Sequence, residues 1–97
     1  MSLKDWKNEN NTICKEFIFD HWHILERFVI FVMNLATKLN HHPNIIISYG
    51  RVQIILTTHD EGGVTALDLD MANKIEAYLD EREHNSQRTV EDEDLPF

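Results

Sequence analysis

The stretch that decides the fold is LNHHPNIIISYGRVQIILTTHD, residues 39–60. Pro43 predicts the end of a preceding helix, because proline disfavours helical backbone in the residue before it. Residues 44–48 and 51–58 are rich in β-branched side chains, and Tyr49-Gly50 between them has the composition of a tight turn. The stretch therefore predicts a helix end that is followed directly by an antiparallel β-hairpin.

The same stretch carries three histidines, His41, His42 and His59. Side chains alternate along a strand, so His59 would continue the face of Thr57 and return beside the histidine pair. Imidazoles titrate near neutral pH, which suits acid–base catalysis. Three imidazole nitrogens could instead hold a zinc ion, or the pair could simply end a helix, where the dipole favours a protonated imidazole. Composition and spacing leave these three interpretations open.

A long helix is predicted before this stretch, over residues 21–39, with Asp20 as its N-cap. Its main apolar stripe, at helical spacing, contains Leu25, Phe28, Val29, Val32, Leu35, Ala36 and Leu39. A second apolar set lies off that stripe and contains Ile24, Ile30, Phe31 and Met33. In a chain of 97 residues, a second apolar side is most simply covered by another polypeptide. We therefore expect a homo-oligomer, and this helix is the expected surface for a protein partner.

The outer parts of the chain supply the remaining elements. Residues 3–7 are a short candidate strand that holds Trp6, residues 8–11 are an asparagine-rich turn, and residues 12–19 form a second strand. After two glycines, Thr65-Ala66-Leu67-Asp68 has the form of a capping box that opens a second helix. The order β-β-α-β-β-α is typical of an α+β domain. Its simplest packing has two layers, with a four-stranded antiparallel sheet and both helices on one face.

These elements are expected to form a single domain, residues 1–82, followed by an acidic and flexible tail, residues 83–97. The net charge is −8, and residues 80–97 contribute −5 through seven acids and two arginines. No basic stripe in the sequence could meet phosphates, so direct nucleic-acid binding is not expected. The longest apolar stretch, residues 28–33, is too short to span a bilayer. Cys14 is the only cysteine, which fits a reducing compartment such as the cytoplasm.

The spacing of the hairpin residues resembles the signature of pterin-4a-carbinolamine dehydratases. That signature has a His-His-Pro-like triplet, then an aromatic residue, a histidine and an aspartate. Here five residues separate Pro43 from Tyr49, nine separate Tyr49 from His59, and eight separate His59 from Asp68. The resemblance covers nearly all of the expected domain, from Trp6 to Tyr78, and its four spaced elements make it specific.

The resemblance implies dehydration of a 4a-hydroxytetrahydropterin to a quinonoid dihydropterin, a step that recycles tetrahydrobiopterin without a metal or an organic cofactor. It implies that His41 and His59 are the acid–base pair, that His42 orients the pterin, and that Asp68 lies near His59. The residues that it implies for substrate binding are Asn40, Thr57, Thr58, Asp60 and Asp68. It also implies a dimer or tetramer with sheets joined edge to edge. The alternative that it suggests is a non-catalytic interaction module of the same fold, such as a transcriptional coactivator. The expected compartment of the protein is the cytoplasm, and also the nucleus.

Two positions leave questions open. Thr37 stands where the family signature has a charged residue, four positions before the first histidine, so a carboxylate that tunes His41 or binds the pterin would be missing. Asp68 is also the fourth residue of the capping box, and in that role it would need no function beyond a bond to the Thr65 amide.

Overall fold

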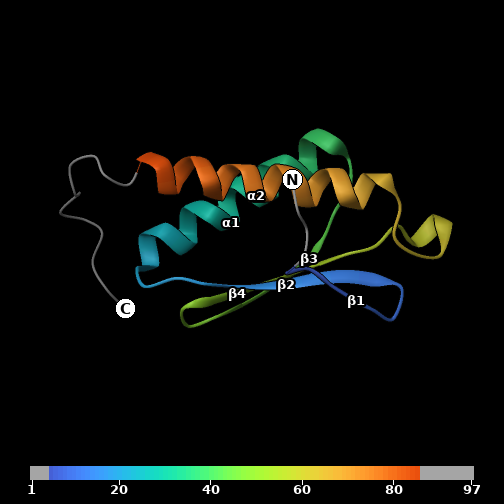
Figure 1. The fold of residues 1–97 in the computed structure, drawn as a ribbon, viewed down its shortest axis with the longest axis horizontal. Helices are drawn as coiled ribbons and strands as arrows, with labels where there is room; N and C mark the ends of the chain where they lie inside the picture. Colours follow the sequence, from blue (N-terminus) through green and yellow to red (C-terminus); the bar gives the residue numbers. More distant parts are fainter. Residues whose placement is uncertain (1–4, 86–97) are drawn as a thin grey trace.

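The computed structural model describes residues 5–85, and its elements follow the predicted order (Figure 1). They are β1 (Lys7–Glu9), β2 (Thr12–Ile18), α1 (Trp22–Leu39), β3 (Asn44–Ser48), β4 (Arg51–Leu56), the 3₁₀ helix η1 (His59–Glu61) and α2 (Ala66–Asn85). The strands form one antiparallel sheet in the order β1-β2-β4-β3. Both helices cover the same face of this sheet (Figure 1), which confirms the predicted two-layer α+β fold.

The hydrophobic core lies between the sheet and the two helices. Strand β4 runs between β2 and β3, and its Val52, Ile54 and Leu56 are fully buried because alternate side chains point toward the helices. The helix side chains that are fully buried opposite them are Phe28, Val32, Met71, Ala72 and Ile75. The core therefore joins the outer helices to the middle of the sheet.

Phe28 is the centre of an aromatic cluster within this core. Its ring lies 4.9 Å from that of Phe17 on β2 and 5.1 Å from that of Phe19. Tyr78 of α2 lies 6.3 Å from Phe28 and stacks on Phe31 at 4.2 Å. Phe31, which the sequence assigns to the second apolar side of α1, is thus partly covered by α2 within the same chain.

A polar contact ties the first hairpin to α2. One carboxylate oxygen of Glu76 accepts hydrogen bonds from the Trp6 indole nitrogen at 2.9 Å and from the Lys15 ammonium at 2.5 Å. Lys15 lies on the helix-facing side of β2, and its side chain is 19% exposed. Because the indole and the ammonium share this acceptor, β1, β2 and α2 are joined by polar as well as apolar contacts.

The start of α1 differs from the prediction. Asp20 is not the N-cap; His21 occupies that position with extended backbone, and no side-chain capping bond is found there among the described residues. The cause is the sheet, because the Phe19 amide still donates to the Gly50 carbonyl at 2.8 Å and holds the chain extended. The first helical bond runs from the Leu25 amide to the His21 carbonyl.

The strand limits are also corrected. The first strand in the described part of the chain is residues 7–9, and residues 3 and 4 of the predicted strand 3–7 lie outside that part. Asn8 and Glu9 therefore pair in the sheet, and Asn10 and Asn11 form the turn, with φ of 52° and 63°. Asparagine accepts this left-handed backbone more readily than most residues do. The returning strand β4 ends at Leu56, before the predicted Thr58.

The second helix continues past the predicted domain boundary at residue 82, to Asn85. The rest of the predicted acidic tail, from residue 86, lies outside the described residues. Neither helix in the described part of the chain has the length and apolar character needed to cross a membrane.

Candidate functional site

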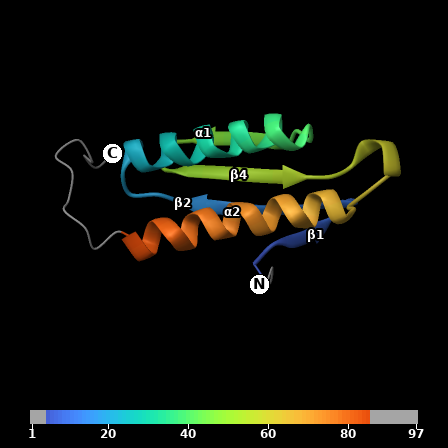
Figure 2. The same cartoon turned by 90° about the horizontal axis from the view of Figure 1, so that it is seen from above.

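One end of the molecule brings together the last turn of α1, η1 and the first turn of α2 (Figure 2). These segments are separated in the sequence by the β3–β4 hairpin, which leaves the end of α1 and returns the chain to the start of α2. The predicted site residues all belong to these segments or adjoin them.

The direction in which His41 leaves α1 is set by the way the helix ends. Asn40 has left-handed backbone, φ 52° and ψ 44°. The Asn40 amide donates to the Thr37 carbonyl at 3.3 Å and the His41 amide to the Ala36 carbonyl at 3.1 Å, which is the Schellman pattern of helix ends. Both of these backbone bonds hold His41 close to the helix that it follows.

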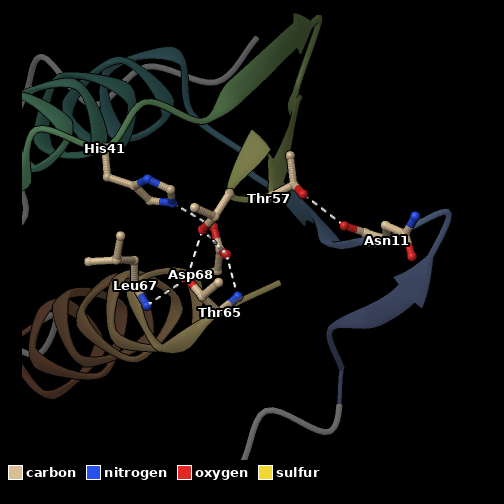
Figure 3. A network of polar contacts seen from close by, with 7 residues as sticks. Asn11, His41, Thr57, Thr65, Leu67 and Asp68 are labelled. Carbon is tan, nitrogen blue, oxygen red and sulfur yellow. Dashed lines mark hydrogen bonds and ion pairs between the residues drawn. The ribbon is translucent and has the colours of Figure 1, made fainter. Parts of the chain in front are cut away.

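The imidazole of His41 points at the carboxylate of Asp68 in the first turn of α2 (Figure 3). His41 Nε2 lies 2.5 Å from Asp68 Oδ1. The Asp68 side chain is fully buried and that of His41 is 10% exposed. Asp68 is the only buried polar or charged residue in the described part of the chain, so this contact is polar whereas the buried residues around it are apolar.

The second carboxylate oxygen of Asp68 has two hydrogen-bond donors. The Thr65 amide donates to Oδ2 at 2.8 Å, and the Thr58 hydroxyl donates to the same atom at 2.7 Å. Burial by itself raises the pKa of the Asp68 carboxyl, but the hydrogen bonds from Thr65, His41 and Thr58, together with the charge on a protonated His41, outweigh it and lower the pKa. Asp68 is therefore ionised at neutral pH.

An ionised carboxylate can only accept hydrogen bonds, so Nε2 of His41 carries the hydrogen in this contact. The other ring nitrogen, Nδ1, is then the atom that can take up or release a proton without breaking the contact. A histidine held in this way by a buried carboxylate has the arrangement needed for general acid–base chemistry.

The other two predicted histidines are exposed at the same end of the molecule. His42 follows His41 directly, and His59 begins η1 next to Thr58, which contacts Asp68. Because β4 ends at Leu56, His59 does not continue the strand face of Thr57 as the alternation predicted. The resemblance places Asp68 near His59; the histidine that contacts this carboxylate is His41, and Thr58, which precedes His59, donates to it as well.

Of the residues predicted to bind substrate, Asn40 and Asp60 are exposed and the two threonines are partly buried. The Thr57 hydroxyl donates to the Asn11 carbonyl of the β1–β2 turn at 2.8 Å (Figure 3), and the Thr58 hydroxyl donates to Asp68. Both hydroxyl hydrogens are thus bonded within the protein, although the oxygen atoms can still accept.

Thr65 was predicted only as a helix cap, and the structure gives it a place beside the site. Its hydroxyl lies 2.7 Å from that of Thr58 and accepts from the Leu67 amide at 3.2 Å. The signal that could have found it is the capping box itself, because the box places Thr65 beside Asp68.

Within residues 5–85, no group of three or more histidine, cysteine, aspartate or glutamate side chains is arranged to hold a metal ion. The three histidines of the zinc hypothesis therefore do not form a ligand set in this geometry.

Comparison with known proteins gives consistent findings. A family model described as pterin 4 alpha carbinolamine dehydratase matches residues 1–78. A Metallosphaera sedula protein provisionally named a pterin-4-alpha-carbinolamine dehydratase is 46% identical over 74 residues, which are 76% of this chain and 77% of that protein. A Chloroflexus aurantiacus protein with the same provisional name is 43% identical over 75 residues, 77% of this chain and 81% of its own length.

Two solved structures have a similar fold. A Brucella melitensis protein described as a transcriptional coactivator/pterin dehydratase has a TM-score of 0.73 and 36% sequence identity, over 77% of this chain and 82% of that chain. A pterin dehydratase-like protein described as a RuBisCO assembly factor in the alpha-carboxysome has a TM-score of 0.62 over 74% of this chain and 83% of its own. At 19% identity, the second likeness concerns the fold alone.

Proposed function

The chain belongs to the pterin 4 alpha carbinolamine dehydratase family, and from this premise we propose that it removes water from a 4a-hydroxytetrahydropterin. The product is a quinonoid dihydropterin, and the step is one part of the recycling of tetrahydrobiopterin after aromatic hydroxylation. The observation that carries the proposal is the buried contact between His41 and Asp68, because it leaves one imidazole nitrogen free at an end of the fold that has two further histidines.

The proposed reaction needs two proton transfers. A proton is delivered to the 4a-hydroxyl group, the bond between carbon 4a and oxygen breaks, and a proton leaves the ring N–H as the new double bond forms. The products are the dihydropterin and one water molecule. Because no electrons are exchanged with another reactant, proton donors and acceptors near neutral pH are sufficient, and we assign the reaction no metal and no organic cofactor.

We assign His41 and His59 as the acid–base pair and His42 as the residue that orients the pterin. Support for His41 comes from its carboxylate partner, and support for His59 comes from its place after Thr58, which bonds to that carboxylate. Substrate binding is assigned to Asn40, Thr57, Thr58, Asp60 and Asp68, which adjoin these histidines in the fold.

Thr37 replaces the charged residue of the family signature, and this replacement does not affect the contact between His41 and Asp68. The Thr37 hydroxyl donates to the Met33 carbonyl of its own helix at 3.2 Å. The bonds that orient Asp68 come from His41, Thr58 and Thr65, and none comes from position 37. We therefore expect a dehydratase that works without a carboxylate at that position.

The test is the rate at which a 4a-hydroxytetrahydropterin disappears, followed by ultraviolet absorbance against a blank without enzyme. We expect the wild type to accelerate the reaction and His41→Ala to lose about 10²-fold or more of that acceleration, because one general acid–base group typically contributes that much. The matched control is His23→Ala, which removes a histidine from the opposite end of α1. A wild type that is folded but no faster than the blank would refute the proposed activity.

A second candidate function is that of a protein-interaction module, and the exposed apolar side of α1 favours it. Ile30 and Met33 lie one turn apart on this helix and are 50% and 57% exposed. Half-exposed large apolar residues that lie together are typical of surfaces that meet another protein. We propose that α1 contacts another protein here, either a second copy in a dimer or tetramer or a different partner.

The proposed compartment is the cytoplasm, with the nucleus as a second location. It rests on Cys14, a buried and unpaired cysteine, which fits reducing surroundings.

A further inference from the structure

The hydroxyls of Thr58 and Thr65 connect Asp68, the partner of His41, to the backbone in the first turn of α2. The Thr58 hydroxyl is 2.7 Å from Asp68 Oδ2 and 2.7 Å from the Thr65 hydroxyl. The Thr65 hydroxyl in turn is 3.2 Å from the Leu67 amide nitrogen. The contacts form a continuous line from the backbone of α2 to the imidazole of His41 (Figure 3).

The direction of each hydrogen bond along this line follows from counting protons. A hydroxyl has one hydrogen to donate, and the hydrogen of Thr58 is used on the carboxylate, which can only accept. The hydrogen between the two threonines must therefore come from Thr65, with the Thr58 oxygen accepting. The Thr65 oxygen accepts from the Leu67 amide, which is held by the helix and cannot reverse its role.

The line therefore has one direction, from Leu67 to Thr65 to Thr58 to Asp68. With the Thr65 amide also donating to Oδ2, this oxygen has two donors from the protein, and Oδ1 is left facing His41. Without the Thr58 hydroxyl, the carboxylate of Asp68 would lose a hydrogen bond. Without the Thr65 hydroxyl, nothing in this chain of bonds would orient the Thr58 hydroxyl toward Asp68. In either case the hydrogen bond between Asp68 and Nε2 of His41 would weaken.

We propose that Thr58 and Thr65 are positioning residues that hold the hydrogen of His41 on Nε2, so that Nδ1 is the nitrogen that exchanges a proton with the substrate. The proposal rests on the proposed dehydratase function for its catalytic consequence, although the position of the hydrogen can be measured without any substrate. It changes the role of Thr58 from a substrate contact to a support for Asp68, and it gives Thr65 a role beyond capping α2.

The first measurement is the imidazole N–H resonance of His41 in ¹⁵N-labelled protein, assigned by its absence in His41→Ala. The wild type should show a slowly exchanging Nε2–H signal, because the hydrogen faces a buried carboxylate. Thr58→Val and Thr65→Val keep the shape of the side chain but remove the hydroxyl, and both should lose the signal or move it strongly. Thr58→Ser and Thr65→Ser restore the hydroxyl and should restore the signal.

The matched control is Thr57→Val, because the hydroxyl of this neighbouring residue donates to Asn11 and not to the line. It should leave the His41 resonance in place. Backbone amide spectra of each variant show whether it is folded, which separates loss of the signal from loss of structure.

The second measurement is the steady-state rate of dehydration. We expect kcat to fall roughly tenfold to a hundredfold in the two valine variants, with KM little changed, because misplacing a proton-transfer group by a fraction of an ångström acts on the transition state. The serine variants should recover most of kcat. A His41 signal that persists in folded Thr58→Val and Thr65→Val, or a kcat that does not change when the signal is lost, would overturn the positioning role. An inactive wild type with an intact signal would instead overturn the proposed function.

Discussion

At the scale of single residues, the carboxylate of Asp68 serves two neighbours at once. Oδ2 accepts from the Thr65 amide, as a capping box requires, and Oδ1 faces the imidazole of His41. The sequence left the structural and the functional interpretation of Asp68 as alternatives. The geometry makes them compatible, because a carboxylate has two oxygens and each takes its own partners.

The stability that Asp68 contributes should depend on pH. The pKa of Asp68 is lowered in the folded protein, so its contribution to stability is complete above the ordinary pKa of 3.8 and is lost as the pH falls through the lower folded pKa. We expect Asp68→Asn to lower the free energy of unfolding by about 1.5–3 kcal/mol at pH 7, because a buried charged acceptor is lost.

The difference between wild type and Asp68→Asn should shrink as the pH falls below about 4. Urea unfolding at a series of pH values measures it. Asp70→Asn is the control, since that carboxylate is half exposed and pairs with Lys74 in the same helix. A difference that stays constant down to pH 2 would show that Asp68 does not titrate as described.

At the scale of elements, the end of α1 decides where the histidine pair goes. Pro43 in the sequence predicted the end of the helix. In the structure the helix ends at Leu39, and the next residue, Asn40, has left-handed backbone. Without that residue in left-handed backbone, the amides of Asn40 and His41 could not reach the carbonyls of Thr37 and Ala36. Asn40, predicted as a substrate contact, therefore has a demonstrable role in shaping the backbone at the site.

Substituting Asn40 tests the contribution of this helix end. Asn40→Val should lower the free energy of unfolding by about 1–2 kcal/mol, because a β-branched side chain is strained in left-handed backbone. Asn40→Gly should be neutral within a few tenths of a kcal/mol. Thr37→Val, on helical backbone in the same turn, is the control, and it should stay within about 0.5 kcal/mol of wild type. Denaturant unfolding gives all four values; equal stability of the valine and glycine variants at position 40 would contradict the prediction.

At the scale of the whole molecule, the fold leaves apolar surface on two sides. One is the outer side of α1, with Ile30 and Met33, and the other is the edge strand β3, where Ile46 and Ile47 are about half exposed. An edge strand carries unpaired backbone groups that can pair with another sheet. Both surfaces fit the dimer or tetramer that the sequence led us to expect.

We expect the wild type to be oligomeric. Met33→Glu should form smaller oligomers or monomers, because at an interface the added charge on the apolar side of α1 would be buried without a partner. Light scattering coupled to size-exclusion chromatography measures the particle mass. Ala77→Glu, which places the same charge on an exposed position of α2, is the control. If Met33→Glu keeps the wild-type mass, this side of α1 is not an interface between copies of the chain.

Most of the fold was predictable from local patterns. Helical spacing predicted α1 and α2, the Tyr49-Gly50 turn predicted the β3–β4 hairpin, and the capping box predicted the first turn of α2. The errors are at the ends of elements. The sheet bond of Phe19 keeps the chain extended past the predicted helix start at Asp20, the first strand pairs over residues 7–9, and β4 ends two residues before Thr58.

The sequence by itself determined the order of elements, the two-layer class of the fold and the family to which the chain belongs, because these depend on spacing along the chain. Only the tertiary structure decided that Asp68 pairs with His41, 27 residues away, and that Thr58 and Thr65 support the pair. The physical reason is that hydrogen-bond partners at this range depend on how the end of α1 packs against the start of α2. No local pattern carries that information, since periodicity and capping rules describe only residues within a few positions of each other.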